Sequence, residues 1–232
     1  MGKESNVRML SYEESLAFLQ EQSKQESDYR IEAEAGKHRL LAIDELRNPL
    51  WEFRLPLPMP ILSEGLSDWK QKVDELEEEI PNYVIMLVQI GAASLGYFEE
   101  GEVYVHKTIK KYMKRHKRGK AQISYLKTRG KSKAGSRIRL ANTVRFFEEI
   151  NEKMQEWEDD YELERIIYSC SAQIWGLLFQ SQSAPPFSKK DERLIKVPMD
   201  VKIPSHEELM RVDEFIKQGR LIIHHEAFHS LV

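Results

Sequence analysis

The sequence predicts an α/β protein in which a mixed β-sheet is flanked by helices. Residues Tyr83 to Ile90 form a near-continuous apolar run, which is typical of a strand buried on both faces. From Ser136 to Trp157, apolar residues recur at spacings of three and four, which predicts a long amphipathic helix. Strand-like and helical patterns alternate along the second half of the chain, as they do in α/β folds.

We expect residues 1–65 to form an extra layer or a subdomain, and residues 66–232 to form a second domain. Ser11 and Glu14 have the spacing of a capping box, which predicts a helix over residues 11–25. The other elements expected in this region are a polar linker over Ser23–Ala35 and strands over His38–Ile43 and Trp51–Leu55.

The segment from Leu55 to Pro60 contains three prolines, which remove backbone donors and exclude a central strand or a helix interior. We expect an extended connector on the surface, with a proline-rich ligand for a partner domain as the alternative. Ser67 then begins a predicted helix that continues to Ile80, and Pro81 follows its end.

The sheet itself is predicted from apolar runs and from the turn signals between them, such as the tight turn at Glu99-Glu100-Gly101. Its expected strands are Tyr83–Ile90, Ala92–Phe98, Glu102–Ile109, Arg165–Ser171 and Leu194–Val197. A short helix is expected over Ala172–Gln180. A second capping box, Ser205 with Glu208, begins a helix that ends before Gly219.

Composition excludes several classes of protein. With 232 residues, of which 41% are apolar, the chain has enough material for one substantial core, or for a core plus a small appendage. No apolar run approaches the length of a membrane span, and Met1 to Leu10 lacks the apolar centre of a signal peptide, so a cytoplasmic location is expected. The single cysteine, Cys170, lies in an apolar run and is expected to be a buried small side chain rather than a nucleophile.

A basic stretch from His106 to Arg145 separates the predicted strands from the long helix. It contains fifteen of the chain's 35 lysines and arginines and no Asp or Glu. Like charges at this density repel one another unless a polyanion neutralises them, so the stretch predicts nucleic-acid binding rather than a solvated face. The expected RNA-binding residues are Lys107, Lys110, Lys111, Lys114, Arg115, Lys117, Arg118, Lys127, Lys131, Lys133, Arg137 and Arg139.

In the middle of this stretch the apolar period is lost and small residues accumulate, which predicts a flexible loop of about 24 residues. We expect the part from Lys114 to Ala134 to be mobile without RNA, because its charges repel and it has few apolar anchors. Half of such a loop, when extended, reaches roughly 30–40 Å, which suits a probe that enters a narrow RNA cavity.

No metal site or cofactor is expected. His225 to His229 matches the H-E-x-x-H pattern of zinc proteases, but that site needs a third ligand and only three residues follow. The two histidines are therefore expected to be ordinary polar residues. The acidic runs fall on helix faces, which is typical of solvated surface rather than of a two-metal nuclease.

Three segments of the basic stretch, His106–Tyr112, Lys117–Gln122 and Lys131–Arg139, resemble the Vms-like release-factor domain family. The resemblance extends over about residues 80–217. It includes the buried strand Tyr83 to Ile90 and, in the tail, Asp191 to Val197 with Pro204, Glu207 and Arg211. This family acts in ribosome quality control as peptidyl-tRNA hydrolases. It is related to the catalytic middle domain of the eukaryotic and archaeal class I release factor. The chain resembles a minimal bacterial member, in which residues 66–232 correspond to the catalytic domain.

The resemblance implies cleavage of peptidyl-tRNA on stalled large ribosomal subunits. Gln122 stands at the position of the release-factor glutamine, which enters the peptidyl-transferase centre and orients water, so Gln122 is the expected catalytic residue. Lys120 and Ala121 replace the two glycines of the release factor, and Gly119 lies one position too early to substitute for them. The implied partners are the large ribosomal subunit, peptidyl-tRNA and rRNA, and no membrane.

Two other functions stay open at this point. The eukaryotic branch of the family is credited with cutting the tRNA chain near its 3′ end, and the sequence does not separate this activity from ester hydrolysis. A non-catalytic ribosome- or RNA-binding module would use the same basic charges. Lys120 favours that module, whereas Gln122 at the expected position argues against it.

Overall fold

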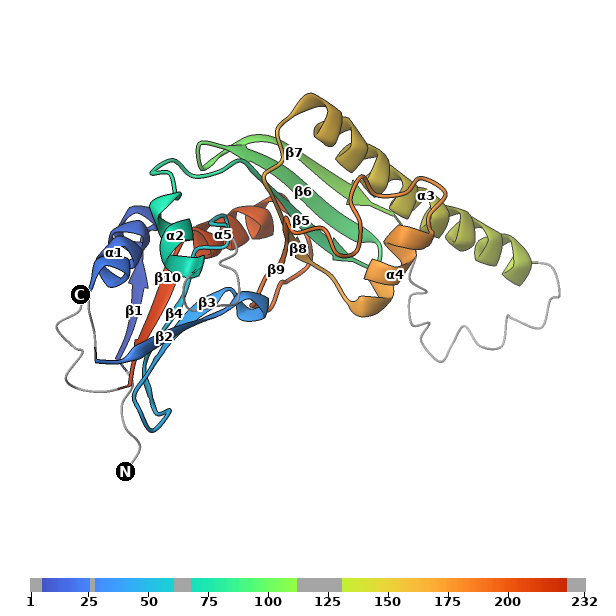
Figure 1. Cartoon of the computed structure of the whole chain (residues 1–232). Helices are drawn as coiled ribbons and strands as arrows, with labels where there is room; N and C mark the ends of the chain where they lie inside the picture. The colour runs from blue at the N-terminus through green and yellow to red at the C-terminus, as the bar shows by residue number, and fades with distance from the viewer. Residues whose placement is uncertain (1–5, 26–27, 61–67, 112–130, 225–232) are drawn as a thin grey trace. The chain divides into compact units, whose positions relative to one another are not determined.

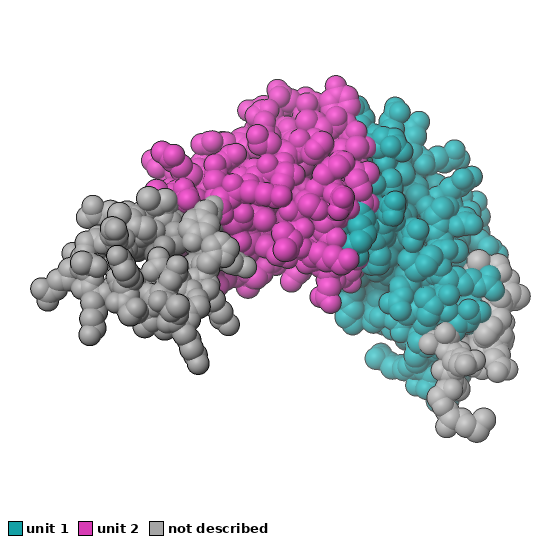
Figure 2. Space-filling model, turned by 180° about the vertical axis from the view of Figure 1, so that it is seen from behind, with its two compact units in different colours: residues 1–82, 99–102, 211–232 teal, residues 83–98, 103–210 magenta. Residues whose placement is uncertain are grey.

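The computed structural model describes residues 6–25, 28–60, 68–111 and 131–224. The chain divides into two compact units, shown in Figure 2. Each unit contains its own five-stranded sheet (Figure 1), and helices flank both sheets, as the predicted α/β class requires. Unit 1 comprises residues 1–82, 99–102 and 211–232, and unit 2 comprises residues 83–98 and 103–210. None of the helices in the described ranges has the length and apolarity of a membrane span.

The sheet of unit 1 is antiparallel, with the order β1-β10-β4-β3-β2. Strand β10 lies between β1 and β4, so a segment from the C-terminal part of the chain completes a sheet made mostly of N-terminal residues. The domain division predicted at residue 65 stays a prediction. The strands are β1 (Asn6–Leu10), β2 (Arg30–Glu34), β3 (Arg39–Ile43), β4 (Pro49–Arg54) and β10 (Gly219–Ile223).

Helix α1 (Tyr12–Lys24) begins at the predicted capping box. The backbone N–H of Glu14 donates to Ser11 Oγ over 3.1 Å, and the backbone N–H of Ser11 donates to Glu14 Oε2 over 2.7 Å. The apolar face of α1 packs on the sheet, where the Phe18 ring lies edge-on to Phe53 at 4.9 Å. The same core includes residues of α2 (Asp68–Asp74), and a short 3₁₀ turn, η1 (Ala35–Lys37), precedes β3.

Several predictions for this region were wrong. Strand β2 lies inside the predicted linker, because the alternation of apolar and acidic residues from Ile31 to Glu34 buries one side of it. The proline segment is not a surface connector: Leu55, Leu57 and Met59 are at most 1% exposed, and the backbone N–H of Leu57 donates to the Ile216 carbonyl over 2.8 Å. This burial also excludes a proline-rich ligand. Helix α2 ends at Asp74, earlier than predicted.

The sheet of unit 2 has the order β7-β6-β5-β8-β9 and is mixed, as predicted. Strand β5 pairs antiparallel with β6 and parallel with β8, and β8 pairs parallel with β9. All five predicted strands are present: β5 (Tyr83–Gln89), β6 (Ala92–Glu99), β7 (Glu102–Lys110), β8 (Arg165–Ser169) and β9 (Leu194–Lys196).

Both faces of β5 are buried, as its apolar sequence predicts. On one face, Val84, Met86 and Val88 share a core with the long helix α3 (Lys131–Asp160), which runs alongside the strands of this sheet in Figure 1. Helix α4 (Ala172–Gln180) adds to this core. On the other face, helix α5 (His206–Ile216) lies so close to Gly96 that a Cβ atom there would be 2.7 Å from the Leu209 side chain.

Helix α3 begins at Lys131, five residues before the predicted start at Ser136. The predicted loop therefore ends earlier, because Lys, Arg and Ala are good helix formers and the helix tolerates Gly135 and Ser136. The rest of the loop predicted to be mobile lies outside the described residues.

Helix α5 begins at the predicted cap, because the backbone N–H of Glu208 donates to Ser205 Oγ over 3.1 Å. The Glu208 carboxylate accepts from the Lys202 backbone N–H over 2.6 Å.

Because α3 packs on β5, we expect a large loss of stability when one of the buried apolar side chains of α3 is truncated. Ile150 is fully buried, so Ile150→Ala is expected to lower the free energy of unfolding by about 2–5 kcal/mol through lost burial and a residual cavity. The control Val144→Ala, on the exposed part of the same helix, is expected to change it by less than about 0.5 kcal/mol. Urea denaturation measures both, and equal effects would contradict the packing described.

Candidate nucleic-acid interface

The structure describes the two supports of the basic segment 112–130, namely the end of β7 and the start of α3. Predicted site residues within the segment lie outside the described residues: Lys114, Arg115, Lys117, Arg118, Gly119, Lys120, Ala121, Gln122 and Lys127. The described part of the interface comes from residues 106–111 and from α3.

Strand β7 is an edge strand of the sheet in unit 2, and its last residues before the basic segment include lysines. Lys107 and Lys110 are exposed, as an RNA-binding role requires, while Ile109 between them is buried and holds the strand on the core. The ring of His106 stacks on His206 at 4.2 Å, which fixes β7 against the first residue of α5.

Lys111 is held in place rather than free. Its backbone N–H donates to the Gly91 carbonyl over 3.0 Å, in the turn between β5 and β6 where Gly91 adopts a φ of 83°. Its Nζ lies 2.7 Å from Glu149 Oε2 on α3. Lys111 therefore links strand and helix at the point where the basic segment leaves the sheet, and its charge is already partly neutralised.

Helix α3 supplies the second support. Lys131, Lys133, Arg137 and Arg139 lie in its first turns, which project beyond the end of the sheet in Figure 1. Arg145 is exposed, and in residues 141–160, where the burial of α3 is described, the first buried side chains are Phe146 and Phe147.

The charges on α3 oppose its macrodipole. The first turn contains lysines and no acidic residue, while the last turn contains Asp159 and Asp160 and no basic residue. Cations near a helix N-terminus and anions near its C-terminus each cost roughly 0.3–1 kcal/mol. Helix stability therefore does not explain this arrangement, and an anion near the N-terminal end would offset its cost.

No catalytic constellation stands out elsewhere in the described ranges. They contain no cluster of three or more His, Cys, Asp or Glu residues suited to a metal. His224 Nε2 lies 2.9 Å from Glu52 Oε1, a carboxylate oxygen that accepts its N–H, just after β10. The H-E-x-x-H residues that follow lie outside the described residues. Cys170 is half-buried rather than buried as expected. Its partial burial still raises the pKa of its thiol to about 11, which agrees with its predicted inert role.

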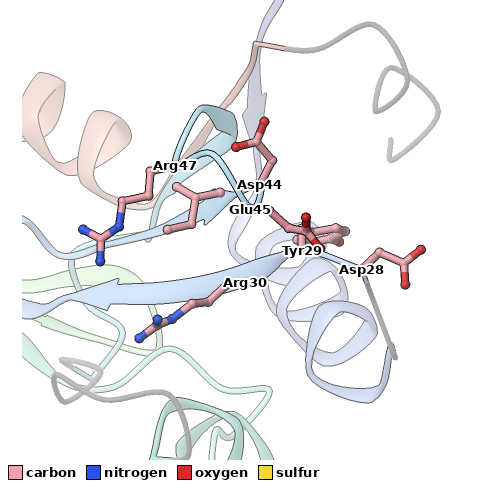
Figure 3. Close-up of a pocket in the computed structure, with 7 residues that line it drawn as sticks. Asp28, Tyr29, Arg30, Asp44, Glu45 and Arg47 are labelled. Carbon is pink, nitrogen blue, oxygen red and sulfur yellow. The ribbon is translucent and has the colours of Figure 1, made fainter.

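A pocket in unit 1 has a volume of about 420 Å³ (Figure 3). Its wall mixes acidic and basic side chains, and the carboxylates of Asp28 and Asp44 point in different directions. Asp44 is used structurally, because its carboxylate accepts from the Asn48 backbone N–H over 2.7 Å and from the Asn48 side chain over 2.9 Å. The lining residues are Asp28, Tyr29, Arg30, Ile43, Asp44, Glu45 and Arg47.

Because the pKa of Cys170 is raised, we expect its thiol to react slowly with thiol reagents. At pH 8, a thiol with a pKa of about 11 is roughly 0.1% ionised, against roughly a quarter for an ordinary cysteine. Reaction with Ellman's reagent is expected to be on the order of a hundred-fold slower in the folded chain than in urea. Equal rates in both states would show that Cys170 is accessible and activated.

Comparison with known proteins places this arrangement in a family. The family model described as the Bacteroidetes VLRF1 release factor matches residues 83–224. The mouse (Mus musculus) tRNA endonuclease ANKZF1 is 28% identical over 134 residues, which cover 56% of this chain and 18% of the mouse protein. The chain thus spans less than a fifth of that relative.

Two solved structures are similar at low sequence identity. The Vms1 mitochondrial localization core has a TM-score of 0.46 and 13% identity, over 85% of this chain and 77% of that one. Pelota from Archaeoglobus fulgidus has a TM-score of 0.30 and 10% identity, over 93% of this chain and 65% of that one. The assignment therefore depends on the sequence match, which spans the sheet of unit 2, the basic stretch and β10. On that match, the chain belongs to the Bacteroidetes VLRF1 release-factor family.

Proposed function

We propose that this protein acts in ribosome-associated quality control by hydrolysing peptidyl-tRNA on stalled large ribosomal subunits. The observation that carries the proposal is the match of a release-factor family model to residues 83–224, a range that includes Gln122 and both supports of its segment. The segment 112–130 is the proposed probe of the peptidyl-transferase centre.

The two elements that flank residues 112–130, the end of β7 and the start of α3, favour a segment that is held in a defined position. Strand β7 is tied to α5 through His106 and to the β5–β6 turn through Lys111, and Lys111 also pairs with Glu149 of α3. The chain therefore enters the segment from a rigid strand and leaves it into a helix anchored from Phe146 onward. A catalytic group has to be held within a fraction of an ångström, and rigid flanking elements help to provide this precision.

In the proposed reaction, water attacks the carbonyl carbon of the ester that joins the nascent chain to tRNA. The bond to the tRNA oxygen breaks, and the products are the nascent chain's carboxylate and an intact tRNA 3′ hydroxyl. The Gln122 side chain orders the water, and its backbone N–H stabilises the oxyanion of the tetrahedral intermediate. This is electrostatic preorganisation and needs no metal from the chain.

Cleavage of the tRNA strand is the second candidate function. The similarity to mouse ANKZF1, whose name describes a tRNA endonuclease, favours it. It would use the same basic interface but would leave a shortened tRNA, so the two reactions differ in the RNA product.

Gln122→Ala is expected to slow peptide release about a hundred- to a thousand-fold, because one preorganised contact to the transition state is lost. Binding to the subunit is expected to be unchanged, since the basic residues provide the affinity. Release from purified large subunits carrying peptidyl-tRNA, followed on a gel that also resolves the tRNA 3′ end, measures both product and rate.

Each outcome of that assay assigns a function. A shortened tRNA would select the endonuclease, and binding by the wild type without release or cutting would select a non-catalytic binding module. Equal release by wild type and Gln122→Ala would remove Gln122 from the mechanism. Gln155→Ala on α3 is a matched control that changes the same residue type away from the segment.

Binding to the large subunit is expected to weaken steeply with salt, and the described lysines are expected to contribute unequally. Lys107→Gln and Lys110→Gln each remove an exposed charge and are expected to lower the log–log salt slope by about 0.7–0.9. Lys111→Gln is expected to lower it by less, because Glu149 already neutralises that charge. Subunit pelleting across a salt titration measures the slopes, with the ion-paired Lys153→Gln as control. Binding that ignores salt would contradict the electrostatic interface.

A further inference from the structure

Three arginines stand side by side across the sheet of unit 1. Arg220 on β10 is opposite Arg54 on β4, and Arg54 is opposite Arg39 on β3. Residues opposite one another on neighbouring strands point to the same face of a sheet, about 4.5–5.5 Å apart at Cβ. This face is the one turned away from the core, because the alternate residues Phe53 and Leu221 are buried.

Only one of the three arginines has its charge matched by the described residues. Arg39 pairs with both Glu34 and Glu52. Arg54 instead donates to the carbonyls of Leu55 and Gln218, over 3.3 and 2.8 Å, and these are neutral acceptors.

The Arg54 guanidinium is held in a fixed orientation. It lies over the Phe215 ring, 4.8 Å from its centre. Its Nε is buried and has no hydrogen-bond partner within the described ranges. Next to it, Arg220 is exposed, and no carboxylate in the part of the chain that the structure describes pairs with it.

Like charges directly opposite one another destabilise a sheet, so the pair Arg54 and Arg220 costs stability in the isolated chain. Burial and the neighbouring Arg220 both oppose the Arg54 charge and lower its pKa to about 10, so it stays ionised at neutral pH. An anion between the two guanidiniums would remove the repulsion. Guanidinium groups suit phosphate, because two parallel N–H donors match two of its oxygens.

We propose that Arg54 and Arg220 form a phosphate site that binds the RNA backbone, as a second RNA contact separate from the basic stretch. The choice of RNA as the source of this phosphate depends on the function proposed above. Glu34 and Glu52 border the row of arginines, so an extended acidic peptide would meet carboxylates of its own sign. A single phosphate group fits between two guanidiniums without this conflict.

The test compares Arg220→Gln with Arg30→Gln. Arg30 lies on the same sheet and is about half-exposed, but it pairs with Glu32 over 3.2 Å, so both variants lose one charge and only one belongs to the site. Fluorescence anisotropy of a labelled RNA is measured with the full chain across a salt titration. Arg220→Gln is expected to lower the log–log salt slope by about 0.7–0.9 and Arg30→Gln to leave it unchanged.

Thermal unfolding separates binding from a structural role. Arg220→Gln relieves repulsion, so without ligand it is expected to melt at or above the temperature of the wild type. RNA is expected to raise the wild-type melting temperature more than that of the variant. A lower melting temperature for Arg220→Gln, with RNA slopes equal to those of Arg30→Gln, would overturn the site.

Two competitors identify the anion. Stabilisation of the wild type by inorganic phosphate, with no Arg220-dependent change in RNA binding, would overturn the assignment to RNA. Stronger Arg220-dependent binding of polyglutamate than of RNA would overturn it in favour of an acidic protein. These measurements do not involve peptide release, so a failure of Gln122 in catalysis would leave them unchanged.

Discussion

The packing of α3 against β5 and β6 is the interaction on which the interface depends. Phe146, Ile150 and Met154 are buried against strands whose residues are themselves buried, so the axis of the helix is fixed from Phe146 onward. Close packing leaves little freedom for such a helix to shift or rotate. Because the basic segment ends where α3 begins, this core also fixes one end of the segment, and the Lys111–Glu149 pair fixes the other end against the same helix.

In two places in this protein, charged side chains lie where they destabilise the helix or strands that carry them. The first turn of α3 contains lysines and its last turn contains aspartates, which the helix macrodipole disfavours. In the other unit, Arg54 lies directly opposite Arg220 on the neighbouring strand. Both arrangements cost stability in the free chain, and a bound polyanion would relieve both. Proteins usually keep such local conflicts where function requires them. Two surfaces of the chain, one in each unit, therefore show the same kind of electrostatic conflict.

Much of the fold was predictable because its signals are local. The apolar run of β5, the capping box at Ser11 and the helical period after Ser136 are each formed by residues of which each lies at most four positions from the next along the chain. What the sequence did not reveal depends on contacts between distant residues. The proline segment after Leu55 is buried by residues far along the chain, and the Lys111–Glu149 pair joins residues 38 positions apart. The register of Arg54 with Arg220 arises only when β10 inserts beside β4. The polar composition of residues 23–35 also concealed β2, whose period-two alternation was present but short.

The central claim concerns the place of Gln122 on the ribosome, and a structure of the chain bound to a large subunit with peptidyl-tRNA tests it most directly. The account predicts that residues 112–130 extend into the peptidyl-transferase centre, with the Gln122 amide within hydrogen-bonding distance of a water beside the ester bond. A complex in which this segment lies on the outer rRNA surface, with Gln122 remote from the tRNA 3′ end, would contradict it.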